Sequence, residues 1–251
     1  MTATNPAGAA HEAGAAERDI EIEQLGETAV LVRFGASVSL ELARRAQRFA
    51  RFAREARIGA LLDVVPAFAS VALFFDIDAL RADETPEQVA EVTLAAWLGA
   101  SSASAAWPGR LVVLPVAYGG ECGPDLEAFA RSVRLAPDVV VERHAAPEYV
   151  VGMVGFLPGF PYLIGLDPAL ELPRHATPRP RVPAGSVAIG GAQTGVYPCA
   201  SPGGWHLLGR CSARMFDPAR AEPSLLRAGD RVRFRPVAAS ELARASVEVG
   251  K

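Results

Sequence analysis

Residues 177–210 read TPRPRVPAGSVAIGGAQTGVYPCASPGGWHLLGR and are much richer in glycine and proline than the sequence on either side. Glycine allows positive φ and close approach of two backbones, whereas proline fixes φ and removes a hydrogen-bond donor, so their alternation specifies turns. Two short apolar runs, residues 186–189 and 205–208, lie between these turns. The stretch therefore predicts short strands whose connecting loops form an active or binding surface.

The segment GGAQTG at residues 190–195 offers backbone N–H groups beside an amide and a hydroxyl, which suits an anion or a polar ligand. It is not a Walker motif, because no Gly-Lys-Ser/Thr follows and the only lysine is Lys251. Arginine must therefore meet any bound phosphate or carboxylate. Four arginines lie on either side of the segment at 190–195, namely Arg174, Arg179, Arg181 and Arg210. The residues alone leave open whether these loops bind a ligand or are structural turns with solvated arginines.

Two strand-strand-helix units are predicted over residues 18–100, which favours a two-layer α+β domain. Their alternating and helical apolar patterns cover residues 20–25, 28–34, 42–53, 60–65, 70–76 and 86–99. The second helix is expected to begin with a capping box, TPEQ at residues 85–88, with proline at its first position. Residues 1–17 lack both a basic start and a continuous apolar segment, so we expect a disordered tail rather than a signal peptide.

Small and polar residues at 101–108 are expected to link this domain to a second one, over residues 109–240. The predicted elements of the second domain are a strand at 111–118, helices at 124–135 and 137–144, and many short strands up to 231–235. Short strands with glycine-rich turns favour a closed antiparallel barrel. Residues 241–251 are expected to be a C-terminal tail.

The net charge and the amino-acid composition argue against some classes of binding partner. The net charge of −3 and the isoelectric point near 5.9 give no field that would gather nucleic acid or anionic lipid, and no apolar run has membrane-spanning length. Cys122, Cys199 and Cys211 are odd in number and form no Cys-x-x-Cys pair, which suits a reducing compartment. We therefore expect a cytoplasmic protein that binds neither nucleic acid nor membrane.

Several spaced motifs carry a resemblance to a known family. They are YGGECGPDL at 118–126, GFLPGFPYL at 155–163, VPAGSV at 182–187, QTG at 193–195, YP at 197–198, SPGGW at 201–205 and GR at 209–210. With these motifs the chain strongly resembles the family that contains the B subunit of 5-oxoprolinase and the first subunit of allophanate hydrolase, over nearly all of its length after the first twenty or so residues. Cys211 departs from the threonine that usually follows Gly-Arg in the family, and Cys199 lies where the pattern varies. The resemblance implies a mainly β, cyclophilin-like barrel after the α+β domain.

The resemblance also implies a function. It points to one subunit of an ATP-dependent 5-oxoprolinase complex, which cleaves 5-oxo-L-proline to L-glutamate with ATP hydrolysis. The implied partners are the C and A subunits of 5-oxoprolinase, ATP belongs to the complex as a whole, and the chain alone is expected to be inactive. Two alternatives stay open within the same family: an inhibitor of a histidine kinase, and a subunit related to urea carboxylase or allophanate hydrolase.

The expected catalytic residues are His144, Gln193 and Thr194. His144 lies four residues before Glu148, where a helix gives way to a strand, and there it can relay protons or merely complement the helix dipole. The resemblance favours a functional role, because the family carries a histidine followed by Tyr149 at this spacing.

Seven further residues are expected to bind the ligand through charge, hydroxyl or backbone N–H groups. They are Arg181, Ser186, Gly195, Ser201, Gly203, Trp205 and Arg210. The Ser-Pro-Gly order at residues 201–203 matches a type II turn that exposes backbone donors. Neither Ser186 nor Ser201 lies in a nucleophile elbow, so serine-protease-like catalysis is not expected.

Phe156, Phe160 and Tyr162 belong to a loop rich in proline and glycine, and we expect them to contact a partner protein of the complex. The alternative is a loop folded back over the barrel. The four histidines, at positions 11, 144, 175 and 206, show no metal-ligand spacing, so no metal is expected to be held by this chain alone.

Overall fold

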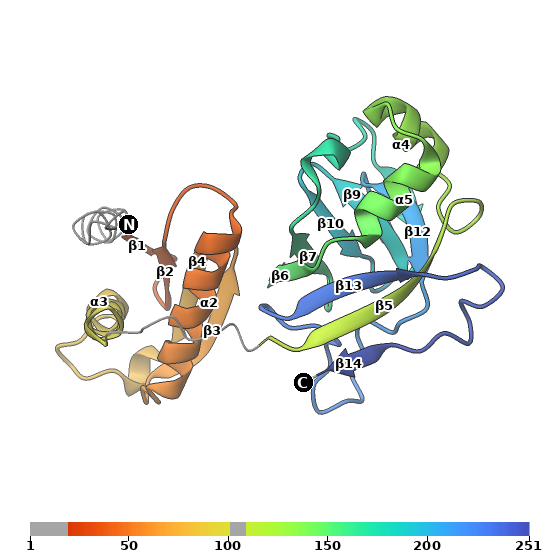
Figure 1. Ribbon diagram of the computed structural model, residues 1–251. Helices are drawn as coiled ribbons and strands as arrows, with labels where there is room; N and C mark the ends of the chain where they lie inside the picture. The colour runs from red at the N-terminus through yellow and green to blue at the C-terminus, as the bar shows by residue number, and fades with distance from the viewer. Residues whose placement is uncertain (1–19, 101–108, 251) are drawn as a thin grey trace, which may run out of the picture. The chain divides into compact units, whose positions relative to one another are not determined.

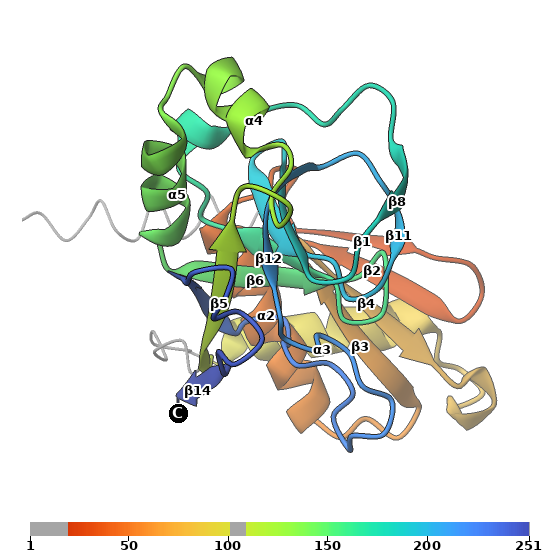
Figure 2. The ribbon, with the colours of Figure 1, turned by 90° about the vertical axis from the view of Figure 1, so that its right-hand side faces the viewer.

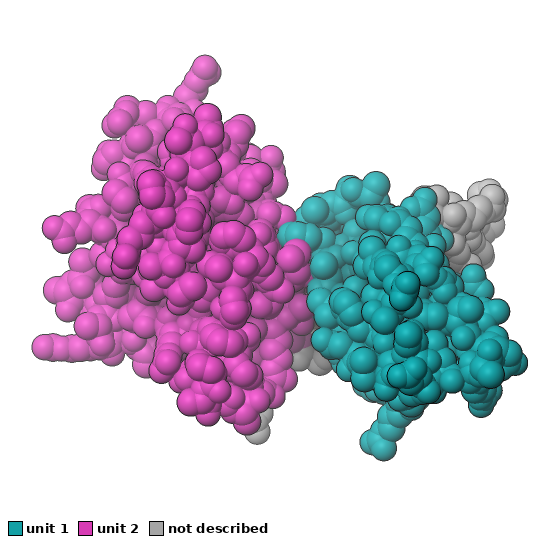
Figure 3. Space-filling view, turned by 180° about the vertical axis from the view of Figure 1, so that it is seen from behind, with its two compact units in different colours: residues 1–106 teal, residues 107–251 magenta. Residues whose placement is uncertain are grey.

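The computed structural model of the chain describes residues 20–100 and 109–250. The chain divides into two compact units, residues 1–106 and 107–251 (Figure 3). The predicted tail at 1–17 and the predicted linker at 101–108 lie outside the described residues. Among the helices of the described ranges, none combines the length and hydropathy needed to cross a lipid bilayer.

The first unit is an antiparallel sheet in the order β1-β2-β4-β3 with two helices. Its elements are β1 (Glu21–Gln24), β2 (Ala29–Arg33), α2 (Leu40–Glu55), β3 (Leu61–Ala67), β4 (Ser70–Phe75), the 3-10 helix η1 (Ile77–Ala79) and α3 (Pro86–Gly99). Side chains from both helices and from the sheet share one apolar core, in which the rings of Phe34, Phe49 and Trp97 meet edge to face at 5.5–5.6 Å. This arrangement is the α+β fold expected from the sequence.

Helix α3 begins with the expected capping box. The Thr85 hydroxyl accepts from the backbone N–H of Gln88, and the Gln88 side chain accepts from the backbone N–H of Thr85. Pro86 occupies a first-turn position, where a missing N–H costs nothing. The start of α3 is therefore specified locally by four residues.

The second unit is a barrel. Its elements are β5 (Leu111–Tyr118), α4 (Leu126–Val133), α5 (Pro137–Ala145), β6 (Tyr149–Val154), β7 (Pro161–Ile164), η2 (Pro168–Leu170), β8 (Arg179–Val182), β9 (Ser186–Gly190), β10 (Gln193–Val196), β11 (Ser201–Gly203), β12 (His206–Cys211), β13 (Arg231–Pro236) and β14 (Glu248–Gly250). The wall follows the order β12-β9-β10-β7-β6-β13-β5 and closes because β12 also pairs with β5 (Figure 1). The mainly β architecture agrees with the sequence, whereas the cyclophilin-like assignment stays a prediction.

Two details of the barrel differ from expectation. Strands β13 and β5 run parallel, so the barrel is mixed and not wholly antiparallel. The long connection after β12 returns the chain to the beginning of β5, where Arg231 pairs with Leu111, and such crossovers permit parallel pairing. Strand β14 forms within residues 241–251, which we predicted to be a tail, because Glu248 to Gly250 pair with β5.

The wall formed by β7, β10, β9 and β12 is apolar on both faces. Along β9, Val187 and Ile189 point into the barrel core, whereas Ala188 points outward. The outward side belongs to a second apolar group, the outer cluster, which consists of Phe160, Val182, Ala188, Tyr197, Trp205 and Leu207. Strands β8 and β11, which pair as a separate two-stranded ribbon, also contribute to this side (Figure 2).

Residues 190–195, where we expected polar groups that bind a ligand, form a tight hairpin. They are the end of β9, a two-residue turn and the beginning of β10. Two of their glycines make room for aromatic rings: a Cβ at Gly190 would lie 2.5 Å from the Trp205 indole nitrogen, and one at Gly195 would lie 3.1 Å from the Phe160 ring. Gly191 has a positive φ of 65° and serves the turn. Residues 201–203 likewise form strand β11 and not a type II turn. Gly190 and Gly195 therefore allow close packing of aromatic side chains against the sheet.

Candidate functional site

The outer cluster continues into an open pocket of about 270 Å³, here called the aromatic pocket. Its lining includes Phe156, Phe160, Tyr162, Trp205 and Arg174. The Phe160 ring lies at the centre of this group, with ring centroids 4.9 Å from Tyr162 and 5.5 Å from Trp205, both edge to face. A concave aromatic surface with one cation suits a small ligand that has an apolar face and a negative charge.

The three aromatic residues expected at a partner interface have different environments. Phe160 is only 1% exposed, which corrects the expectation that it contacts a partner and supports the alternative that the loop folds back over the barrel. Phe156 is 61% exposed and has a positive φ of 69°, a conformation that non-glycine residues adopt rarely. Phe156 is therefore the residue of this loop that is available to a partner or ligand.

Arg174 supplies the positive charge of the aromatic pocket. It is exposed, and it forms no ion pair or side-chain hydrogen bond with the described part of the chain. Burial raises the pKa of Tyr162 and of Tyr197, and the Arg174 charge opposes both shifts, so the guanidinium acts on the two phenol groups. An arginine without a carboxylate partner beside aromatic rings can accept an anionic ligand.

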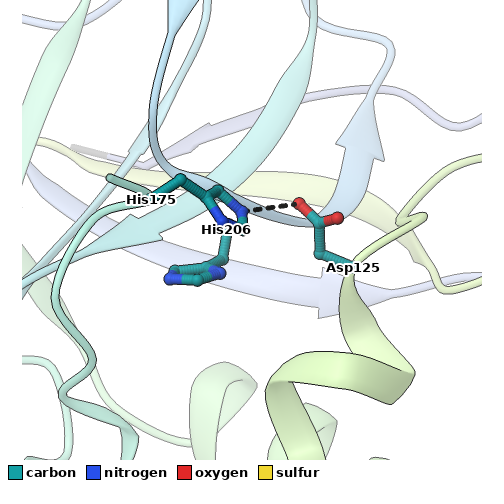
Figure 4. A group of neighbouring side chains, drawn as sticks. All are labelled: Asp125, His175 and His206. Carbon is teal, nitrogen blue, oxygen red and sulfur yellow. Dashed lines mark ion pairs between the residues drawn. The ribbon is translucent and has the colours of Figure 1, made fainter. Parts of the chain in front are cut away.

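A polar cluster adjoins the aromatic pocket. Asp125, His175 and His206 lie together (Figure 4), and Arg179 forms an ion pair with Asp125. Asp125 Oδ1 accepts from Arg179 Nη2 at 2.5 Å, and Oδ2 accepts from the backbone N–H of Leu207 at 2.7 Å. His175 Nε2 lies 3.7 Å from Oδ2. The sequence did not indicate this grouping, since Asp125, His175 and His206 come from distant segments that no spacing rule connects.

The segment of residues 174–179 joins the polar cluster to the aromatic pocket. Along it, Arg174 and Pro178 line the pocket, whereas His175 and Arg179 face Asp125. The backbone N–H of His175 donates to the carbonyl of Gly204, another pocket residue, at 2.8 Å. Any change in the cluster can therefore move a wall of the pocket.

His144 and Thr194, two expected catalytic residues, lie inside the barrel. The Thr194 hydroxyl donates to the carbonyl of Ala188, so it accepts from His144 Nε2 at 2.8 Å. His144 Nδ1 then accepts from the Tyr118 hydroxyl at 2.8 Å. Every polar atom of this chain of hydrogen bonds is satisfied when the imidazole is neutral. Burial accordingly lowers the pKa of His144 to about 3 and raises the pKa of Tyr118 well above its ordinary value.

This buried hydrogen-bond chain is separate from the aromatic pocket. Both His144 and Thr194 are fully buried, and they lie on the inner side of β10, whereas Gly195 on the same strand touches Phe160 on the outer side. Gln193, at the beginning of β10, is half-buried and does not line the aromatic pocket. All the hydrogen bonds of His144 and Thr194 are thus made within the barrel, and their catalytic role stays a prediction.

The seven expected ligand-binding residues do not all lie at the aromatic pocket. Gly203 and Trp205 line the aromatic pocket, and Gly195 lies beneath Phe160. The other four do not line it: Ser186 and Ser201 are buried, Arg181 is exposed on β8, and Arg210 is half-buried on β12. The residues that sequence reasoning missed are Arg174, whose flanking position was its only signal, and Tyr197.

A family model described as "Carboxyltransferase domain, subdomain C and D" matches residues 20–226, which is most of the chain and includes the aromatic pocket and the polar cluster. The chain belongs to this family. The matched carboxyltransferase subdomain C and D region spans the described residues of the first unit and the barrel up to the segment before β13.

Relatives of this carboxyltransferase-domain protein are known by name. It is 39% identical to the 5-oxoprolinase B subunit of Bacillus subtilis, over 85% of this chain and 91% of that protein. It is 44% identical to the 5-oxoprolinase B subunit of Escherichia coli O157:H7, over 84% of this chain and 94% of that protein. The crystal structure of TTHA0988 superposes with a TM-score of 0.71 at 41% identity, over 84% of this chain. This chain spans only 40% of TTHA0988.

Proposed function

We propose that this chain is one component of an ATP-dependent 5-oxoprolinase complex, which hydrolyses 5-oxo-L-proline to L-glutamate, and that the aromatic pocket receives the substrate. The observation that carries the proposal is Arg174, which has no ion-pair or side-chain hydrogen-bond partner among residues 20–100 and 109–250, beside the rings of Phe156, Tyr162 and Trp205. The two named relatives at 39% and 44% identity support the same reaction.

The chemistry of the substrate fits the aromatic pocket. 5-Oxo-L-proline is a small five-membered lactam with one carboxylate, so it offers a flat apolar face and a negative charge. The aromatic rings can cover the ring face, while the Arg174 guanidinium holds the carboxylate through two parallel hydrogen bonds. Trp205 and Phe160, which pack against glycines of the barrel wall, give the pocket a rigid floor.

The reaction needs ATP because the lactam is unstrained and stabilised by resonance. Phosphorylation of the amide oxygen turns this poor electrophile into one that water can open. In our proposal ATP is bound at the level of the complex, the homologues of the C and A subunits complete the active site, and the isolated chain is inactive.

Arg174→Ala is expected to raise the KM for 5-oxoproline about 10- to 100-fold in the reconstituted complex, because charge-assisted hydrogen bonds contribute about 1.5–3 kcal/mol. The measurement is 5-oxoproline-dependent ADP release with the homologues of the A and C subunits present. Arg244→Ala removes another exposed arginine and is the matched control, with an expected KM equal to that of the wild type.

An unchanged KM in the Arg174→Ala complex contradicts the placement of the substrate. Urea and allophanate, offered to the same wild-type complex, test the urea-related alternative. ADP release with either of them, and none with 5-oxoproline, overturns the proposed reaction itself.

Phe156→Ser is expected to weaken association with the homologue of the C subunit at least tenfold, since Phe156 is the exposed aromatic residue of its loop. Titration calorimetry of the two purified chains measures this affinity. The melting temperature of the variant should stay within a few degrees of the wild type, because Phe156 is mostly exposed and its ring contact among the described residues is the edge-to-face contact with Phe160. An unchanged affinity removes Phe156 from the interface.

A further inference from the structure

We propose that Asp125, His175 and His206 form a binding site for one divalent transition-metal ion of the zinc class. The three side chains place one oxygen and two ring-nitrogen donors within 4.8 Å of one another (Figure 4). Two imidazoles and a carboxylate are a donor set that zinc, cobalt and nickel accept, and such three-ligand sites keep a fourth position open. The proposal replaces the prediction, made from histidine spacing alone, that this chain holds no metal.

His206 is oriented as a ligand. Its Nε2–H donates to the backbone carbonyl of Pro173 at 2.9 Å, which fixes the tautomer and leaves the lone pair of Nδ1 available. Metal-ligating histidines usually donate their other ring N–H to a carbonyl or carboxylate in this manner. The side chain is 8% exposed, so its ring has little freedom to turn away.

His175 supplies the second nitrogen. Its Nε2 is buried and has no hydrogen-bond partner, although buried polar atoms are nearly always paired. The ring centroid lies 4.0 Å from that of His206, and Nε2 lies 3.7 Å from Asp125 Oδ2. Tetrahedral zinc with bonds of about 2.0–2.1 Å needs donors about 3.4 Å apart. The three donors lie within 4.8 Å of one another, so metal binding needs the His175 side chain, which is 33% exposed, to rotate toward the other two ligands.

Asp125 is held in place before any metal arrives. Arg179 donates a hydrogen bond to Oδ1, and the backbone N–H of Leu207 donates one to Oδ2, the oxygen nearer to His175. A carboxylate oxygen has two lone pairs, so Oδ2 can accept from Leu207 and bind a metal at the same time. The neighbouring Arg179 charge weakens the attraction for a cation, so we expect a site that an added chelator empties readily.

The position of the site suggests what the metal does. His175 is adjacent in sequence to Arg174 and packs through its backbone on Gly204, so a metal on His175 fixes one wall of the aromatic pocket. This consequence rests on the proposed function. The proposed metal binding does not rest on the proposed function, because it is measured on the isolated chain without substrate or partner.

The test uses the full chain, freed of metal with a chelator and titrated with Co²⁺ and then with Zn²⁺. We expect one ion per chain by calorimetry, and a visible Co²⁺ absorption of the intensity typical of four- or five-coordinate sites. His175→Gln and His206→Gln should each lower the affinity at least tenfold and remove the absorption. His11→Gln, which removes a histidine outside the proposed site, and Cys199→Ser, which removes an exposed thiol, should leave both unchanged.

Absence of Co²⁺ and Zn²⁺ binding in the wild type overturns the proposal. Equal affinity in the wild type and His175→Gln overturns it as well. Since His175 is partly exposed, the His175→Gln variant is expected to fold. If His206→Gln fails to fold, the result for His175→Gln alone decides the test.

Discussion

Phe160→Ala is expected to lower the free energy of unfolding by about 3–5 kcal/mol, the range for deleting a buried aromatic side chain. Phe160 is 1% exposed and makes edge-to-face contacts with Tyr162, Tyr197 and Trp205, with ring centroids 4.9–5.5 Å apart. The cavity cannot close easily, because the floor beneath the ring is the backbone of strand β10. Urea unfolding monitored by tryptophan fluorescence and circular dichroism measures the change.

Phe156→Ala is the matched control, since it deletes the same side chain from the same loop at a position that is 61% exposed. Its expected effect is within about 0.5 kcal/mol, as for most exposed positions. Equal losses in the two variants contradict the assignment of Phe160 to the outer cluster and of Phe156 to the surface.

Protonation of His144 is expected to remove up to about 5 kcal/mol of stability between pH 6.5 and pH 3. Burial lowers the pKa of His144 from 6.5 to about 3, and each pKa unit corresponds to about 1.4 kcal/mol. Below pH 6.5 His144 is protonated in the unfolded chain but stays neutral in the folded chain, so the free energy of unfolding falls as the pH falls. Above pH 6.5 the contribution is constant.

His144→Gln is the informative variant, because its amide can still accept from Tyr118 and donate to Thr194 but does not titrate in this range. Burial also lowers the pKa of His206, and that effect is present in both proteins, so the difference between the two stability curves isolates His144. Parallel curves from pH 6.5 to pH 4 would show that His144 is accessible to protons in the folded state.

The sequence predicted elements whose signals are local. The capping box at Thr85 and Gln88 and the alternation of residues 231–235 each lie within a few residues, and the structure contains them. The parallel pairing of β13 with β5 was missed, because strand direction depends on where the long connection after β12 leads.

The site was less predictable for two physical reasons. Glycine at positions 190 and 195 signals either a turn or a close approach, and only the position of the Trp205 and Phe160 rings decides between them. The grouping of Asp125, His175 and His206 depends on three distant segments that no spacing rule connects. The sequence assigned Gly203 and Trp205 to ligand binding and Phe160 to a partner interface, and did not predict that all three line one pocket.

The closure of the barrel by β5 has a consequence for the order of folding. Strand β5 comes first in its unit, yet its three neighbours, β12, β13 and β14, are the last strands of the described chain to be synthesised. On a ribosome, the long β5 strand must therefore wait with unpaired backbone groups until nearly all of the barrel has emerged. Pairings of such large sequence separation fold slowly.

In the first unit, β1 pairs with β2 and β3 pairs with β4 across short turns, so these hairpins can form while the barrel is still being made. The nascent barrel is thus the part of this protein that most needs protection from aggregation, and β5 is the strand that a chaperone would have to shield.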